Sequence, residues 1–209
     1  GSPGLVDGTA TSFDGTNDFG VSASNLDYTG KKKIAIKALI KLDSGISGDR
    51  MAWESSSNTN SGNTGFTYFT NNGNNSNVLL KGDSGYNYGL FPNPILDQWH
   101  HVVVIYDKGA TVSSEETKLY IDGLLQSASS RPQSNNNNND FGTNPFYVMS
   151  RAGISNFSKG SMQHLAIYSD LSPADIANHA QMALGNPSSL TAGTLSLGSK
   201  NSNSATVSW

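Results

Sequence analysis

The feature that constrains the fold most is a series of short segments in which apolar and polar residues alternate. In residues 33–42, Ile34 and Ile36 fall on one face of an extended chain, and Lys37 and Lys41 fall on the other. Alternation with a period of two residues is typical of a β-strand that has one face buried and the other in water.

Further segments with strand-like patterns are separated by clusters of glycine and asparagine. They are residues 12–22, 50–54, 65–70, 76–81, 99–106, 118–121, 146–150 and 161–168. The stretch 101–106 is almost continuously apolar, which indicates a central strand covered on both faces. Trp53 and Trp99 lie within these patterns, and we expect both in the core.

One helix is predicted, from Pro173 to about Leu184. Ser172 and Asp175 form an N-terminal capping pattern, Pro173 takes the first helical position, and Gly185 ends the segment. A single short helix after this many strands predicts an all-β fold, namely a two-sheet antiparallel β-sandwich of the jelly-roll type.

The composition changes at residues 185–189, which read Gly-Asn-Pro-Ser-Ser. We therefore predict a first domain over residues 1–185, followed over residues 186–209 by a linker and two strands, 194–197 and 204–209. Two strands cannot bury a core. The tail is either the incomplete beginning of a second β domain or an extension that packs on the first domain.

Composition excludes several classes of protein. The 209 residues include no cysteine, so disulfide scaffolds and thiolate metal sites are excluded. The net charge of −3 offers no basic field for a phosphate backbone, so no nucleic-acid partner is expected. No stretch approaches the roughly 18 apolar residues that a membrane span needs, so no membrane insertion is expected.

Two segments are rich in asparagine, 71–77 and 134–140, and the second holds five consecutive asparagines. Such runs tolerate positive φ angles and supply no apolar core, so both are predicted to be exposed loops or hairpin tips. They are either amide-rich loops that contact sugar or solvated turns.

Four segments, in their order along the chain, resemble the laminin-G-like branch of the concanavalin A-like lectin/glucanase superfamily. Residues 13–19 resemble the opening strand and turn of that family, and residues 97–104 resemble its W-x-H-V-x-V strand. Residues 119–123 resemble its L-Y-V-D-G hairpin, and residues 160–176 resemble its closing strand and helix. The likeness covers about residues 8–184. The tail over residues 186–209, with residues 204–209 in it, is similar to the first two strands of a fibronectin type III domain.

The resemblance implies a jelly roll that serves as a sugar- or protein-binding module of a larger extracellular, cell-surface or virion protein. The closing segment, with Gln163 and His164 and a helix that carries His179, looks most like versions from bacterial and phage surface proteins.

Catalytic patterns are missing from the sequence. A glycosidase needs two carboxyl groups roughly 5–10 Å apart, and no predicted strand carries acids at positions i and i+2. Glu115 and Glu116 are adjacent in a Ser/Thr-rich turn, where consecutive side chains diverge. We therefore predict no catalytic residues and a protein that is not an enzyme.

The four histidines are interpreted as hydrogen-bonded structural residues, since no G-x-S-x-G nucleophile motif accompanies them. Strand alternation predicts that His100 and His101 face opposite ways. It also predicts that His164 shares a face with Met162, Ala166 and Tyr168.

A sugar site needs an aromatic face together with planar polar groups. Residues 83–94 supply both, in a segment whose glycines and prolines predict a loop instead of a continuous strand. Asp83, Tyr86, Asn87 and Tyr88 are therefore the predicted ligand-binding residues. The alternative is that the aromatic rings anchor this loop to the core.

Calcium is the one cofactor considered, because carboxylates and amides cluster in one turn. Asp14, Asn17 and Asp18 form a D-x-x-N-D pattern, and Asp122 lies at a hairpin tip. Related modules often add acids from the closing strand, where this chain has Gln163 and His164. The alternative is that Asp14 and Asp18 only form the turn.

Three functional hypotheses follow. The first is a non-catalytic adhesion module that binds a glycan or a cell-surface polysaccharide. The second is a structural decoration or spacer of a phage tail, a capsid or a bacterial adhesin, which contacts only other subunits. The third is a glycoside hydrolase with an unrecognised site.

Overall fold

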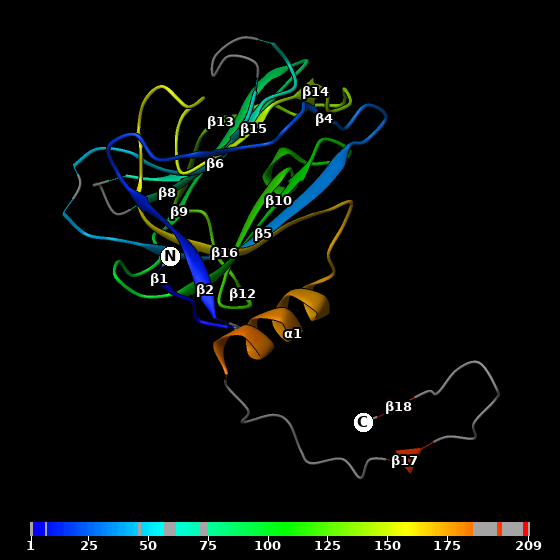
Figure 1. Ribbon diagram of the computed structural model, residues 1–209. Coiled ribbons are helices and arrows are strands. Elements are labelled where there is room, and N and C mark those ends of the chain that lie inside the picture. Colours follow the sequence, from blue (N-terminus) through cyan, green and yellow to red (C-terminus); the bar gives the residue numbers. More distant parts are fainter. Residues whose placement is uncertain are drawn as a thin grey trace.

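The computed structural model describes residues 2–6, 8–45, 47–56, 62–71 and 75–185, with 196–197 and 207–208 in the tail. Two antiparallel seven-stranded sheets face each other (Figure 1). In spatial order, the first sheet contains β1 (Ser2–Pro3), β2 (Thr9–Asp14), β16 (Lys159–Tyr168), β5 (Lys33–Leu42), β10 (His100–Asp107), β11 (Thr117–Ile121) and β12 (Leu124–Leu125). The second contains β13 (Ser130–Ser134), β9 (Gly85–Pro92), β8 (Asn75–Gly82), β7 (Phe66–Thr70), β6 (Arg50–Ser55), β15 (Phe146–Val148) and β3 (Gly20–Val21).

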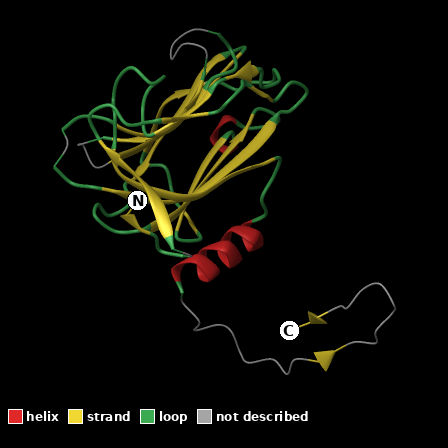
Figure 2. Cartoon of the chain, in the orientation of Figure 1, coloured by secondary structure: helices red, strands yellow, loops and turns green. Residues whose placement is uncertain are grey.

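The remaining elements are small. β4 (Leu26–Asp27) pairs with β14 (Thr143–Asn144), a 3-10 turn η1 covers Ser113–Glu115, and the helix α1 covers Pro173–Leu184 (Figure 2). The predicted fold class is confirmed: the protein is a two-sheet antiparallel β-sandwich with one short helix.

The main core lies between the sheets, where side chains that alternate along the strands meet. Trp53, Tyr68 and Tyr106 are fully buried there, and Trp53 Nε1 donates to Tyr106 Oη at 3.1 Å. Strand β10 is buried along nearly its whole length, as its continuous apolar pattern predicts. Trp99 precedes this strand and is half-buried, so its predicted place in the core is not observed.

The outer face of the first sheet is not a wet face, which corrects the interpretation of residues 33–42. Leu171 and Ile176 of the α1 region pack on Ala35, Val103 and Ile105, which project outward from β5 and β10. The helix is held in place by the predicted capping box between Ser172 and Asp175, and it ends at a left-handed Gly185. Figure 1 shows α1 lying against this sheet.

Residues 85–92 form the regular strand β9 and not the predicted loop. The error arose because Gly89, Asn87 and Pro92 are poor strand formers by composition. Here each residue of 85–92 has a partner on β8, from Gly85–Gly82 to Pro92–Asn75, so pairing overrides propensity. The predicted strand 12–22 is also divided, into β2 and β3 with a turn between them.

A β-bulge in β16 corrects the predicted faces of the closing strand. The register with β5 shifts between Gln163 and Ala166, and His164 adopts a left-handed φ of 51°. A bulge adds a residue and so reverses the alternation beyond it. Met162 therefore faces the main core, whereas Tyr168 packs against the core cluster under α1, so these two residues do not share one face as predicted.

The asparagine tract at 134–140 is mostly exposed, as predicted, but one of its residues is buried and anchors it. Asn137 is fully buried, and its backbone and side-chain amides donate to the two carboxylate oxygens of Glu116, a residue that is itself fully buried. Beside it, Asn139 Oδ1 accepts from Lys108 Nζ at 3.2 Å. The tract is thus an exposed segment that is anchored to the protein at Asn137 and Asn139. In the other tract, residues 72–74 lie outside the described part of the chain.

In the tail, β17 (Ser196–Leu197) pairs antiparallel with β18 (Val207–Ser208). The other residues on which the second-domain prediction rests lie outside the described part of the chain. That prediction, including its fibronectin type III-like character, stays a prediction. Among the described residues, no helix has both the length and the apolar character required to cross a membrane.

Candidate functional site

The four predicted ligand-binding residues do not share one surface. Asn87 projects into the sandwich and is fully buried. Its amide nitrogen donates to the Ser113 carbonyl at 2.6 Å, and its Oδ1 accepts from Thr117 Oγ1 and from the Arg131 guanidinium at 3.2 and 3.3 Å. These contacts give Asn87 a structural role.

Asp83 and Tyr86 belong to the end of the β8–β9 hairpin. Asp83 is exposed, and its Oδ1 accepts from the backbone nitrogen of Asn138 at 2.9 Å. This contact, with further amide donors nearby, lowers the carboxyl pKa of Asp83. The Tyr86 ring lies under Lys81, with Nζ 4.8 Å from the ring centroid. Asp83 is therefore occupied in holding the asparagine tract.

Tyr88 stands on the outer face of the second sheet, in a row of directly paired residues. Glu54, Thr67, Leu79 and Tyr88 pair in turn across β6, β7, β8 and β9. Directly paired residues point to the same side of a sheet. The next row on that side contains Phe69, which pairs with Met51 and with Asn77.

A pocket of about 150 Å³ lies over these rows. Its floor and walls contain both aromatic and aliphatic side chains, and its polar groups are one carboxylate, one guanidinium and two hydroxyls. The lining residues are Asp49, Met51, Thr67, Phe69, Leu79, Tyr88 and Arg151.

A tight turn after β15 presents Arg151 to this pocket. Ile154 N donates to the Arg151 carbonyl at 3.0 Å, and Arg151 N donates to the Ser155 carbonyl at 2.8 Å. The two residues between them, Ala152 and Gly153, have left-handed φ angles of 53° and 71°. A left-handed alanine costs about 1 kcal/mol, and such backbone strain tends to cluster at functional sites.

Some polar groups of the pocket have hydrogen-bond partners within the protein, and others have none among the described residues. The Thr67 Oγ1 atom is buried and has no hydrogen-bond partner in the described part of the chain. Tyr88 Oη donates to Asn77 Oδ1, and burial together with the Asp49 charge raises the pKa of Tyr88. The Tyr88 hydroxyl, whose proton is used by Asn77, can still accept a hydrogen bond from a polar ligand.

Glu54 lies beneath the pocket and is fully buried. Burial raises its carboxyl pKa, while a hydrogen bond from Ser56 Oγ at 2.9 Å and the charge of Arg151 act in the opposite direction. Glu54 therefore faces the guanidinium from below and does not line the pocket. The surface of the pocket presents one carboxylate, that of Asp49.

The predicted calcium residues are used within their own turns. Asp14 Oδ1 accepts from the backbone nitrogens of Thr16 and Asn17 at 2.7 and 3.3 Å, and Asp18 Oδ2 accepts from the Asp14 nitrogen at 3.1 Å. Asp122 bonds His100 Nδ1 at 2.7 Å.

No group of three or more His, Asp or Glu side chains suited to a metal ion occurs within the described ranges. Calcium takes six to eight oxygen ligands. The donors that the described residues bring together at Asp14 and Asp18 do not fit such a site, and calcium binding stays a prediction.

Sequence comparison finds one family model that matches the chain. It is described as the concanavalin A-like lectin/glucanases superfamily and matches residues 14–177. No curated protein sequence matches the chain.

Solved structures resemble this fold at low sequence identity. The native heptameric SAP-like pentraxin from Limulus polyphemus has a TM-score of 0.59 at 14% identity, covering 81% of this chain and 80% of the pentraxin. The CBM40 module of a Ruminococcus gnavus IT-sialidase, solved bound to α2,3-sialyllactose, has a TM-score of 0.57 at 14% identity, covering 85% of this chain and 98% of the module. A mutant NanB sialidase from Streptococcus pneumoniae has a TM-score of 0.58 at 13% identity over 84% of this chain, which spans 28% of that enzyme.

Proposed function

The chain belongs to the concanavalin A-like lectin/glucanases superfamily, and from that premise we propose that it is a non-catalytic carbohydrate-binding module. The observation that carries the proposal is the pocket over Phe69 and Tyr88, here called the Tyr88 pocket. It combines aromatic rings for the apolar face of a sugar with charged and hydroxyl groups for its polar edge.

Each part of a sugar ring has a partner in the Tyr88 pocket. Aliphatic hydrogens pack on the rings of Phe69 and Tyr88, while hydroxyls bond Asp49 and Arg151. The resemblance to a CBM40 module solved with sialyllactose supports glycan as the ligand class.

The non-catalytic assignment is supported by the single carboxylate that lines the Tyr88 pocket. Glycoside hydrolysis needs two carboxyl groups that both reach the scissile bond. Asp49 lines the pocket, whereas Glu54 is fully buried below it. We place this module in a larger extracellular, cell-surface or virion protein, as the resemblance to surface lectin modules implies.

The test is a glycan array probed with the full chain, containing α2,3-sialyllactose, lactose and neutral plant and bacterial oligosaccharides. We expect the best binder to lose about tenfold or more in affinity on Tyr88→Ala, because truncating a central aromatic contact costs more than 1 kcal/mol. Isothermal titration calorimetry measures the change.

Tyr86→Ala is the matched control, since Tyr86 lies two residues away on the same strand and does not line the pocket. It should bind as the parent does. If no glycan on the array binds, the carbohydrate proposal is wrong. If binding survives Tyr88→Ala and Arg151→Ala together, glycan binds elsewhere.

A further inference from the structure

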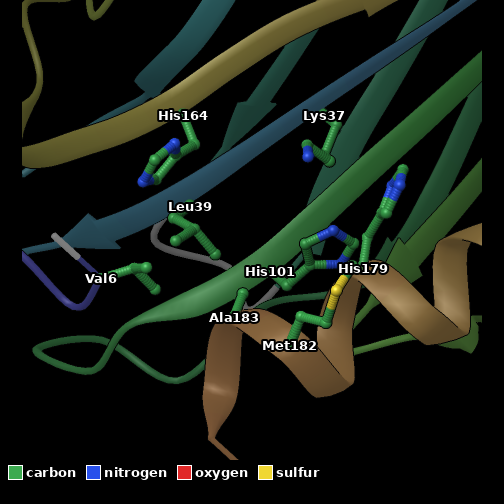
Figure 3. A pocket seen from close by; sticks show the side chains of 8 residues that line it. All are labelled: Val6, Lys37, Leu39, His101, His164, His179, Met182 and Ala183. Atoms are coloured by element: carbon green, nitrogen blue, oxygen red, sulfur yellow. The ribbon is translucent and has the colours of Figure 1, made fainter. Parts of the chain in front are cut away.

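A second pocket lies on the opposite side of the sandwich, between α1 and the outer face of the first sheet. It encloses about 140 Å³, and side chains from β5, β10, β16 and α1 line it (Figure 3). Its polar lining consists only of groups that carry or can acquire positive charge, namely Lys37, His101, His164 and His179.

His101 is the most deeply buried of these groups. Its side chain is 1% exposed, and both ring nitrogens are buried without a hydrogen-bond partner in the described part of the chain. Leu39 pairs with it across β5 and β10, so its ring lies on the helix side of the sheet. His179 Nδ1 on α1 is also buried and unpartnered. Buried donors without acceptors are costly, so a ligand that supplies acceptors gains that energy.

Lys37 differs from the two lysines that flank it on the same face of β5. Lys33 pairs with Asp170 at 2.7 Å, and Lys41 reaches Asp43 at 3.9 Å. Lys37 forms no ion pair with any described residue, and its Nζ lies 5.9 Å from the centroid of the Tyr168 ring. The half-buried Lys37 side chain lines the same pocket as the two histidines (Figure 3).

The acids nearest to this pocket are occupied elsewhere. Asp122 accepts from His100 Nδ1 and from the backbone nitrogen of His101, and Asp175 is part of the capping box of α1. Burial, then the charges of Lys37 and His179, lower the pKa of His101 to about 4, with Asp122 only partly opposing them. Burial and Lys37 also lower the pKa of His179, against Asp175.

We propose that Lys37, His101 and His179 form a binding site for a small carboxylate anion. The two oxygens of a carboxylate accept from the ammonium and from imidazole N–H groups, which satisfies donors that the folded chain leaves unpaired. Val6, Leu39 and Met182 give the rest of the pocket an apolar lining, which suits the organic body of such a ligand better than a fully hydrated inorganic ion.

A metal ion is not the occupant that these residues favour. The three imidazoles do not form a metal-binding group within the described ranges, and an unpaired ammonium beside them repels a cation. The site lies on the other sheet from the Tyr88 pocket and does not depend on the carbohydrate proposal.

The test follows the imidazole Cε1–H NMR signals of the full chain as sodium acetate or sodium glucuronate replaces sodium chloride at constant ionic strength. The signals of His101 and His179 should shift and saturate, while the signal of His100, which faces Asp122, should not. Affinity should rise by up to about tenfold per pH unit on acidification for each proton taken up with the anion.

Three separate titrations distinguish the kinds of ligand that could supply the carboxylate. Acetate tests the carboxylate alone, glucuronate tests an acidic sugar, and methyl glucoside is the neutral control, which should have no effect. Lys37→Gln should weaken acetate binding about tenfold, because a charge-assisted contact is lost. Lys41→Gln is the matched control on the same strand face and should leave binding unchanged.

The proposal is overturned if neither anion shifts the two histidine signals, or if sodium chloride has the same effect as acetate. Equal weakening by Lys37→Gln and Lys41→Gln would also overturn it, because the effect would then be general screening. Circular dichroism checks that each variant is folded. If Lys37→Gln does not fold, the titration of the parent chain decides.

Discussion

Burial of His101 without a partner makes the stability of the protein depend on pH. Its pKa falls from 6.5 to about 4 on folding, so its contribution to stability is complete above pH 6.5. As the pH falls from 6.5 toward the folded-state pKa, His101 binds a proton in the unfolded chain but not in the folded chain. Proton binding therefore favours the unfolded chain, and the contribution to stability is lost. A shift of this size corresponds to roughly 3 kcal/mol in the free energy of unfolding.

Urea unfolding at pH values between about 7 and 4, in chloride buffers, measures this loss. His101→Gln should flatten the dependence, because a neutral amide replaces the titrating ring. His164→Gln should retain it, since His164 is exposed. Equal pH dependence in the parent and in His101→Gln would show that other groups govern the acid response.

The contacts of a single residue were predictable from the sequence where the partner is a near neighbour along the chain. Ser172 and Asp175 form their capping box within one turn of helix, and the capping pattern predicts it. The shared face of Met162 and Tyr168 was mispredicted because a bulge in β16 reverses the alternation between them, and bulges leave little trace in sequence. Asn87 was mispredicted because its partners, Ser113 and Thr117, come from distant segments.

The asparagine tract behaves as a structural element with its own polar core. Around it, Asp83 Oδ1 accepts from the Asn138 nitrogen, and Asn137 Oδ1 accepts from the Ser84 nitrogen at 3.1 Å. The hairpin approaches so closely that a Cβ at Gly82 would collide with the Asn137 side chain. Lys108, fully buried, bonds the Asn63 carbonyl at 2.7 Å on the other side.

Asn137→Ala should lower the free energy of unfolding by about 1–3 kcal/mol, because it removes the side-chain amide that donates to the buried Glu116 Oε2, while the backbone N–H at position 137 still donates to Oε1. Asn136→Ala, at the exposed neighbouring position, should change it by less than about 0.5 kcal/mol. Urea denaturation followed by tryptophan fluorescence measures both. Equal losses in the two variants would mean that the tract is not organised around Glu116.

Strands were predictable where alternation is strong, and not where composition conceals it. Segments such as 50–54 and 76–81 appear as β6 and β8 with bounds within about one residue. β9 was not predicted as a strand, because glycine, asparagine and proline interrupt its alternating pattern, although every residue of β9 pairs with β8. The buried anchor of the asparagine tract at Asn137 was not predicted, because a run of one residue type gives no periodic signal.

At the scale of the molecule, the sandwich separates the two proposed sites onto opposite outer faces. The Tyr88 pocket lies on the second sheet, and the pocket under α1 lies on the first. Because neither set of lining residues contacts the other, their binding energies should be additive.

The double variant Lys37→Gln/Tyr88→Ala should therefore lose acetate affinity as Lys37→Gln does and glycan affinity as Tyr88→Ala does. Calorimetric titration with each ligand measures the two losses separately. A coupling energy above about 0.5 kcal/mol between the two substitutions would show that the sheets transmit one binding event to the other.

Family and fold class were predictable because four motifs keep their order over most of the chain. The Tyr88 pocket was only partly predictable, since its lining comes from five separate stretches of the chain, from Asp49 to Arg151. Arg151 reaches the pocket through a left-handed turn that no alternation pattern reports. Tyr88 itself was predicted, because an aromatic ring among polar residues is a local signal.

The packing of the asparagine tract bears on how such a gene can change. A replication slip that adds or removes one asparagine codon leaves composition almost unaltered, yet it moves a different residue of 135–139 opposite Glu116. The five identical asparagine residues therefore occupy five structurally different positions. We therefore expect a change of repeat length in this segment to disturb the contact with Glu116, in contrast to repeats that vary freely in surface loops.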